Sequence, residues 1–276
     1  MKKTILITGA SSGLGKAAAK LFAQNDWNVI ATMRRPENEQ ELTALKNVFV
    51  TRLDVEQPDT IAAAIQAGIE KFGSIDALVN NAGYGEFGTF EGTPQKNVQA
   101  QFAVNVFGVM DTIRAILPHF RARKVGTIIN ISSGAGRFTL PLISLYCASK
   151  FALEGFSEAL SFELSALNIA VKIVEPGGAT TNFGKVSGDK FGEQTPIADY
   201  DHFKSVTGKL FDTLRGMRLV SAEEVADVIY KAATDGTDTL RYTVGNDDFK
   251  ARIKARESLP DQEYINSIKN AYLKFM

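Results

Sequence analysis

A glycine-rich segment between the first β-branched run and the first helical run constrains the fold of this chain more than any other feature. It reads Thr8-Gly-Ala-Ser-Ser-Gly-Leu-Gly15 and precedes an amphipathic run at residues 16–24. Glycines at a strand-to-helix turn let the backbone approach a ligand, while the helix N-terminus offers free N–H groups to a phosphate. The segment therefore predicts a βαβ unit with a pyrophosphate site, although taken alone it also fits an ordinary chain reversal.

Beyond this turn, short β-branched runs alternate with longer amphipathic runs. This order predicts an α/β fold in which a doubly wound parallel sheet carries helices on both faces. The runs predict strands at residues 4–8, 28–33, 48–52, 77–80, 126–131, 170–175 and 239–243, and helices at residues 13–24, 58–72, 94–121, 145–167 and 221–234. Since no internal repeat and no Pro/Gly/Ser-rich linker interrupts the pattern, we expect residues 1–276 to form a single domain.

The composition excludes several classes of protein. With 31 Lys and Arg against 31 Asp and Glu, the chain lacks the basic excess of nucleic-acid and membrane-surface proteins. Its single cysteine cannot close an intrachain disulfide, and its two histidines are too few to indicate a metal site. The apolar start is too short for a signal peptide, and no apolar run approaches the ~18 residues of a membrane helix. We therefore expect a cytoplasmic chain without a metal, a nucleic-acid partner or a membrane span.

The end of the second predicted strand indicates which dinucleotide the turn binds. NAD-binding folds place a carboxylate about 20 residues after the glycines, where it holds the ribose 2′-hydroxyl. Here the segment reads Ala31-Thr-Met-Arg-Arg-Pro36 and holds no carboxylate. Because the guanidinium group matches phosphate geometry, we predict that Arg34 binds the 2′-phosphate of NADP, assisted by Arg35 and the Ser12 hydroxyl. The alternative is that both arginines are solvated surface charges.

Tyr146 and Lys150 are the strongest catalytic candidates. They lie four positions apart on a predicted helix and so share one face, where the ammonium group is expected to lower the pKa of the phenol from its usual value of about 10. Proton transfer near neutral pH then becomes feasible. Ser133 follows the predicted strand 126–131, at the carboxyl edge where open α/β sheets bind ligands.

The spacing alone is weak evidence, because Tyr200 and Lys204 repeat it with Ser187 placed before them as Ser133 is placed before Tyr146. Ser187 lies in a polar loop that no predicted strand precedes. We therefore assign the chemistry to the set that contains Tyr146.

Taken in order, these motifs resemble those of the short-chain dehydrogenase/reductase family, from residue 4 to about residue 181. The turn at residues 8–15, Asp54-Val55, Asn80-Asn-Ala-Gly83 and Pro176-Gly177 stand where that family has its cofactor motifs. Gly178 and Ala179 depart slightly from the pattern. The resemblance implies a Rossmann fold and a cofactor site made by Gly9, Ser11, Ser12, Gly13, Leu14, Gly15, Arg34, Arg35, Asp54, Val55, Asn81, Ala82, Gly83, Tyr146, Lys150, Pro176, Gly177 and Thr181.

The resemblance also implies a catalytic tetrad of Asn105, Ser133, Tyr146 and Lys150. NADPH would deliver hydride to a carbonyl carbon while the Tyr146 hydroxyl supplies a proton to its oxygen, and Ser133 would hydrogen-bond that oxygen. Asn105 would bend its helix locally and hold a water beside Lys150. Family members assemble through their two long helices, so a homodimer or homotetramer is implied.

Two segments are expected to shape the substrate side. Residues 182–220 are long and punctuated by glycine, as substrate lids are, and residues 246–276 read as one or two amphipathic helices of a C-terminal extension. The apolar side chains at residues 138–143, before Tyr146, and within residues 182–220 favour a bulky hydrophobic ketone, aldehyde or alcohol. Within the family this is most similar to the 17-beta-hydroxysteroid/retinol dehydrogenase-like branch. Alternatively, these residues fill core or subunit contacts.

Two other functions remain open at this stage. A regulatory protein could bind NADP as a sensor without chemistry, but it would not need the full tetrad. A sugar-nucleotide epimerase or dehydratase of the related extended type would usually need a longer C-terminal domain than the ~30 residues after residue 243.

The assignment of Arg34 predicts a selective effect on cofactor binding. Arg34→Glu places a carboxylate where the 2′-phosphate is expected, so NADPH should bind far more weakly while NADH is affected much less. Steady-state kinetics with both cofactors measures the difference. An equal loss for NADPH and NADH would show that Arg34 does not read the phosphate.

Overall fold

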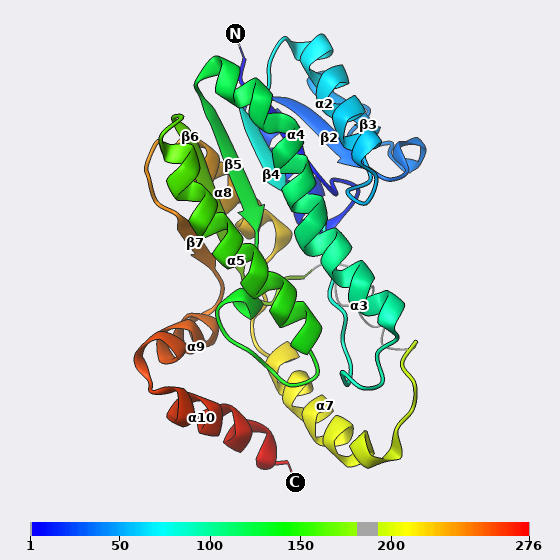
Figure 1. Ribbon diagram of the computed structural model, residues 1–276, viewed down its shortest axis with the longest axis vertical. Helices are drawn as coiled ribbons and strands as arrows, with labels where there is room; N and C mark the ends of the chain where they lie inside the picture. Colours follow the sequence, from blue (N-terminus) through cyan, green and yellow to red (C-terminus); the bar gives the residue numbers. More distant parts are fainter. Residues whose placement is uncertain (1, 181–192, 276) are drawn as a thin grey trace.

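The computed structural model describes residues 2–180 and 193–275, and a parallel β-sheet forms its middle layer (Figure 1). The sheet has seven strands in the order β3-β2-β1-β4-β5-β6-β7, and every neighbouring pair is parallel. The order reverses between β1 and β4, which creates the switch point at which such sheets bind ligands. The strands are β1 (Thr4–Ile7), β2 (Asn28–Met33), β3 (Val48–Arg52), β4 (Ala77–Asn80), β5 (Gly126–Ile131), β6 (Ile169–Pro176) and β7 (Arg241–Val244). The predicted fold class is confirmed, and the largest shift at a strand start is that of β7, which begins two residues later than predicted.

Helices cover both faces of the sheet, because alternate side chains of each strand point to opposite sides. Ile5 and Ile7 of β1 pack under α1 (Gly13–Gln24) and α8 (Ala222–Thr234). Leu6, between them, faces the other layer. That layer consists of α2 (Pro58–Phe72), α4 (Gly108–Arg123) and α5 (Ser144–Ser165). Helix α8 begins with a capping box, since Ser221 Oγ accepts from Glu224 N at 3.0 Å and Glu224 Oε2 accepts from Ser221 N at 2.8 Å.

The predicted helix at residues 94–121 is interrupted by a local change of winding. Helix α3 (Gln95–Phe102) passes through a π-helical turn at Ala103–Phe107 into α4, which ends at Arg123. The π turn contains Asn105, where the sequence predicts a local bend, and such turns recur at functional sites. By length and composition the stretch Gln95–Arg123 could cross a membrane, and 44% of its most apolar window is buried against the rest of the protein.

The helices of the predicted lid and of the C-terminal extension lie beyond the carboxyl ends of the strands in Figure 1. Helix α7 (Asp201–Arg215) falls in the segment 182–220 that is predicted as a lid, of which residues 182–192 are outside the described residues. Helices α9 (Asp247–Ser258) and α10 (Asp261–Leu273) form the C-terminal extension. The rings of Phe203 on α7 and Tyr272 on α10 meet edge to face, with centroids 5.8 Å apart. The extension therefore packs against the predicted lid.

A polar triad ties β6 and β7 to the end of α8. Lys172 Nζ donates to Asp235 Oδ1 at 2.7 Å and to the Tyr242 hydroxyl at 3.0 Å, and that hydroxyl donates to Asp235 Oδ2 at 2.7 Å. Burial opposes ionisation of Asp235, but the hydrogen bonds from Lys172 and Tyr242 outweigh it and hold the pKa of the carboxyl well below its usual value. Lys172 is almost fully buried, so its charge depends on this partner.

Asp235→Asn should lower the free energy of unfolding by about 3 kcal/mol, because it leaves the buried Lys172 ammonium without its counter-charge. A depressed folded pKa stabilises the fold above the unfolded pKa of about 4 and loses that effect as the pH falls. The difference between wild type and variant should therefore shrink below pH ~4 in denaturant titrations. Asp238→Asn, at an exposed position of the same loop, is the matched control, and an equal effect there would contradict the account.

Candidate active site

The glycine-rich turn packs tightly against neighbouring segments. At two positions no side chain larger than a hydrogen atom fits. Gly9 has a φ of +68°, and a Cβ there would lie 2.9 Å from Ala82 Cα. A Cβ at Gly15 would lie 2.4 Å from Asn81 Nδ2 and 2.5 Å from Gly9 O. The N-terminal end of α1 is thereby left with bare backbone and the exposed hydroxyls of Ser11 and Ser12. Such a cradle fits a dinucleotide pyrophosphate.

A set of hydrogen bonds locks this turn to the end of β4, across the switch point. Thr8 Oγ1 accepts from the backbone N–H groups of Asn81 and Ala82, both at 3.0 Å. In return, Asn81 Nδ2 donates to Thr8 O at 2.9 Å and to Gly9 O at 3.1 Å. The two motifs that the sequence analysis assigns to the cofactor therefore form one rigid unit.

The arginines predicted to read the 2′-phosphate follow β2 and are exposed. Within the described residues, neither Arg34 nor Arg35 forms an ion pair or a side-chain hydrogen bond, so both guanidinium groups can receive a ligand. The neighbouring carboxylates are engaged elsewhere, because Glu39 pairs with Lys16 at 3.2 Å and Glu41 pairs with Lys16 at 3.1 Å. Asp54 and Val55 lie directly after β3, where Asp54 Oδ1 accepts from Glu56 N at 3.1 Å.

The four predicted catalytic residues come from three elements and converge at the carboxyl edge of β4 and β5. Tyr146 and Lys150 lie on α5, Ser133 opens the 3₁₀ turn Gly134–Gly136 after β5, and Asn105 lies in the π turn. Lys150 Nζ donates to Ile131 O at 2.9 Å and lies 5.9 Å from the centre of the Tyr146 ring. The Ser133 hydroxyl is hydrogen-bonded to the Tyr146 side chain.

Asn105 joins this group to the cofactor side. Its Oδ1 accepts from Tyr84 N at 3.1 Å, while its Nδ2 donates to Tyr84 O at 2.9 Å and to Ser149 Oγ at 3.2 Å. A Cβ added at Gly83 would lie 3.1 Å from Asn105 Oδ1 and 3.8 Å from Lys150 Nζ. Because Gly83 has no side chain, Lys150 and Asn105 can lie close to the segment that is locked to the glycine-rich turn.

The sequence leads us to expect that Lys150 lowers the pKa of Tyr146. In the chain without a bound ligand this expectation is wrong. Burial of the phenol raises its pKa to about 12, and the hydrogen bond with Ser133 offsets only part of this effect. Burial also lowers the pKa of Lys150 to about 8. The physical reason is that desolvation opposes both charged forms, while the ammonium group is directed at the Ile131 carbonyl. Tyr146 is therefore a stable proton donor at neutral pH.

The second Tyr-x-x-x-Lys is built differently. The Tyr200 hydroxyl donates to Glu91 Oε2 at 3.0 Å, and Lys204 pairs with Asp201 at 2.7 Å. The two side chains thus have separate partners, and Ser187 lies outside the described residues. No shared polar centre is formed around them in the described part of the chain.

The residues after β6 lie where the nicotinamide end of a cofactor is expected. Gly177 N donates to Val244 O at 2.8 Å, and a Cβ at Gly177 would lie 3.0 Å from the ring of Phe249. Ala179 forms an isolated parallel bridge with Val220, whereas Thr181 lies outside the described residues. Phe249, on α9, also closes on Gly134 and Gly245. This contact could not be predicted from the sequence, because the residues around Phe249 in the chain do not distinguish it from the other phenylalanines.

Tyr146 belongs to an apolar cluster of buried and partly buried side chains. Its members are Phe87, Ala135, Leu140, Ile143, Tyr146, Cys147 and Phe211. Burial raises the pKa of the Cys147 thiol to about 11, so this residue stays protonated at neutral pH. A neighbouring open cavity of about 500 Å³ is lined by Gly88, Thr89, Phe90, Glu91, Leu142, Ser144, Tyr200 and Phe203.

Comparison with known proteins agrees with this geometry. Residues 3–190 match the family model described as short chain dehydrogenase. The chain is 41% identical over 216 residues to an uncharacterised oxidoreductase of Schizosaccharomyces pombe, which spans 78% of this chain and 89% of that protein. It is 35% identical over 224 residues to a 3-ketodihydrosphingosine reductase of Bacteroides thetaiotaomicron, covering 80% of this chain and 76% of that protein. The solved structure of ElxO with NADP bound has a TM-score of 0.72, with 28% identity, and covers 88% of this chain and 98% of that one.

Proposed function

Because the chain belongs to the short-chain dehydrogenase family of oxidoreductases, we propose that it is an NADP(H)-dependent enzyme that transfers hydride between the nicotinamide and a hydrophobic ketone, aldehyde or secondary alcohol. The observation that carries the proposal is the meeting of a buried, neutral Tyr146, a buried Lys150 and Ser133 beside the locked glycine turn. A protein that only sensed NADP would not need these groups together.

NADPH, when bound, would supply the hydride. Tyr146 provides the proton for the carbonyl oxygen, since its phenol remains protonated well above neutral pH. Ser133 donates a hydrogen bond to the same oxygen and stabilises the charge that develops there. Lys150, in its ammonium form, stabilises the phenolate left on Tyr146 and holds the nicotinamide ribose. Asn105 keeps the helix open at the π turn and holds a water that supplies protons to Lys150.

The preference for NADP(H) is supported by charge. The strand end at Met33 carries no carboxylate that would repel a 2′-phosphate, and the exposed guanidinium groups of Arg34 and Arg35 follow it directly. The binding of NADP by the similar structure of ElxO agrees with this choice. In this proposal the remaining cofactor contacts are those named in the sequence analysis.

The substrate is proposed to be apolar because the side chains that cluster with Tyr146 are apolar. Phe87 meets the Tyr146 ring edge to face, with centroids 6.3 Å apart, and Leu140 and Phe211 pack against the same cluster. The open cavity adds Phe90 and Phe203. The similar 3-ketodihydrosphingosine reductase is named for a long-chain ketone. A carbonyl on a long aliphatic or polycyclic skeleton therefore suits the site better than a small polar substrate.

The proposed enzyme is cytoplasmic and a homodimer or homotetramer. Phe162 of α5 is 71% exposed, and Phe107 and Phe151 are also exposed on the long helices. Large aromatic side chains in water on neighbouring helices favour a subunit interface. In this assembly the subunits would meet through α4 and α5, the two long helices.

Tyr146→Phe should fold, bind NADPH and lose nearly all carbonyl reduction, because it removes only the hydroxyl that gives up the proton. Cofactor binding is measured by NADPH fluorescence and turnover by NADPH oxidation. Tyr230→Phe removes a hydroxyl on α8, away from the tetrad, and serves as the control with near-normal turnover. Retention of near-normal turnover by Tyr146→Phe would sink the proposal.

A further inference from the structure

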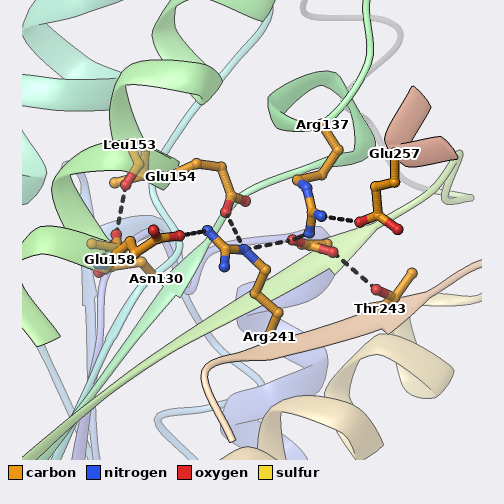
Figure 2. Close-up of polar contacts among 10 residues, drawn as sticks. Asn130, Arg137, Leu153, Glu154, Glu158, Arg241, Thr243 and Glu257 are labelled. Carbon is orange, nitrogen blue, oxygen red and sulfur yellow. Dashed lines mark hydrogen bonds and ion pairs between the residues drawn. The ribbon is translucent and has the colours of Figure 1, made fainter. Parts of the chain in front are cut away.

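A network of charged side chains begins one helical turn after Lys150 (Figure 2). Glu154 lies four residues after Lys150 on α5 and therefore on the same face of the helix, and its side chain is only 6% exposed. Arg241 of β7 holds it from the opposite side, with Nε 3.0 Å from Glu154 Oε2. The same guanidinium group donates to Glu158 Oε2 at 2.5 Å. Carboxylate and guanidinium come from segments 87 residues apart in the chain.

The network continues across β6 to the C-terminal extension. Glu175 is completely buried and accepts from Arg137 Nη1 at 2.7 Å and from Thr243 Oγ1 at 2.9 Å. Its Oε1 also lies 3.4 Å from Arg241 Nε. Arg137 pairs in addition with Glu257 on α9 (Figure 2). Glu154 is thus held by a rigid frame in which α5, β6, β7 and α9 all take part.

This frame contains more carboxylates than guanidinium groups. Four carboxylates share two guanidinium groups, namely Glu154, Glu158, Glu175 and Glu257 with Arg137 and Arg241. Glu154 is buried, and the Ser132 hydroxyl and Arg241 are the hydrogen-bonding groups that hold its carboxyl in the described part of the chain. A Cβ at Gly136 would touch both Glu154 Cγ and Ser132 Oγ at 2.8 Å, which places that serine beside the carboxyl. Burying carboxylates in excess of their guanidinium partners is unfavourable for stability alone, so the surplus negative charge points to another role.

Lys150 is the cation that this surplus faces. Its ammonium group donates to the neutral Ile131 carbonyl. Around it lie Asn105, Gly83 and the phenol of Tyr146, which are all uncharged. Of the neighbouring charges in the described chain, Glu154 is the one that favours the ammonium form, whereas burial disfavours it.

We propose that Glu154 is a positioning residue of the active site: its buried carboxylate, clamped by Arg241, keeps Lys150 in the ammonium form that supports proton transfer by Tyr146. The inference rests on the proposed function, because only a reaction at Tyr146 needs the charge on Lys150. Burial favours the neutral acid of Glu154 and so raises its pKa, while Arg241 opposes this and favours the carboxylate. Arg241 thus acts on the lysine through the glutamate.

The test compares pH profiles of kcat/KM for NADPH-dependent reduction in Glu154→Gln and Glu158→Gln. Both variants remove one partner of Arg241 and keep the side-chain shape, but Glu158 lies a further turn from Lys150 and is half exposed. In wild type we expect an alkaline limb near pH ~8, where Lys150 loses its proton. Glu154→Gln should move that limb to lower pH by about one unit, since a carboxylate one helical turn away acts through the partly screened interior. Glu158→Gln should leave it in place, and Glu154→Asp should restore most of the shift.

A second measurement does not depend on turnover. The titration of Lys150 is followed by the Cε resonance in protein labelled with isotopic lysine, with Lys150→Met to assign the signal. The pKa of Lys150 should fall in Glu154→Gln and stay unchanged in Glu158→Gln. An unchanged lysine titration in folded Glu154→Gln, with activity lowered equally at every pH, would overturn the inference and leave Glu154 a structural residue. If wild type had no reductase activity, the proposed function would fail, while the titration would still decide whether Glu154 sets the charge of Lys150.

Discussion

The hydrogen bonds between the first turn and the end of β4 hold the geometry on which the rest of the site depends. Asn81 donates to Thr8 from both its backbone N–H and its side-chain amide, across the point where the strand order reverses. The approach is so close that a Cβ at Gly9 or Gly15 would overlap the partner chain segment. This lock sets where Gly83 lies, and Gly83 in turn leaves the space beside Asn105 and Lys150. The same backbone contacts therefore position both the glycine-rich turn and the predicted catalytic residues.

Desolvation is the second constraint that organises the site. It keeps Tyr146 protonated and Cys147 a thiol, and it pushes Lys150 toward its neutral form. A proton donor gains from this environment, whereas a lysine that must stay charged does not. In the inference drawn above, the acidic frame behind α5 supplies an opposing field. Its ion pairs also bind the C-terminal helix α9 to the strands that carry the site.

Much of this arrangement could be predicted from the sequence. The strands are buried on both faces and read as short β-branched runs, and the motifs around Gly9, Asn81 and Tyr146 each stand at the end of such a run, so their meeting at one sheet edge follows from parallel topology. Other features could not be predicted, because they depend on distances and burial. The contact of Phe249 with three glycines and the pairing of Arg241 with Glu154 join segments far apart in the chain. The pKa of Tyr146 could not be predicted for the same reason, since helical spacing says nothing of how deeply a phenol is buried.

The central claim is that this site performs hydride transfer with NADPH and does not merely bind it. The most direct measurement is NADPH oxidation by the wild-type chain with a panel of apolar ketones and aldehydes, in parallel with NADPH binding followed by fluorescence. The account predicts tight NADPH binding together with turnover of at least one long-chain or polycyclic carbonyl compound. Tight NADPH binding without turnover of any compound in the panel would contradict it and would favour a protein that senses the cofactor.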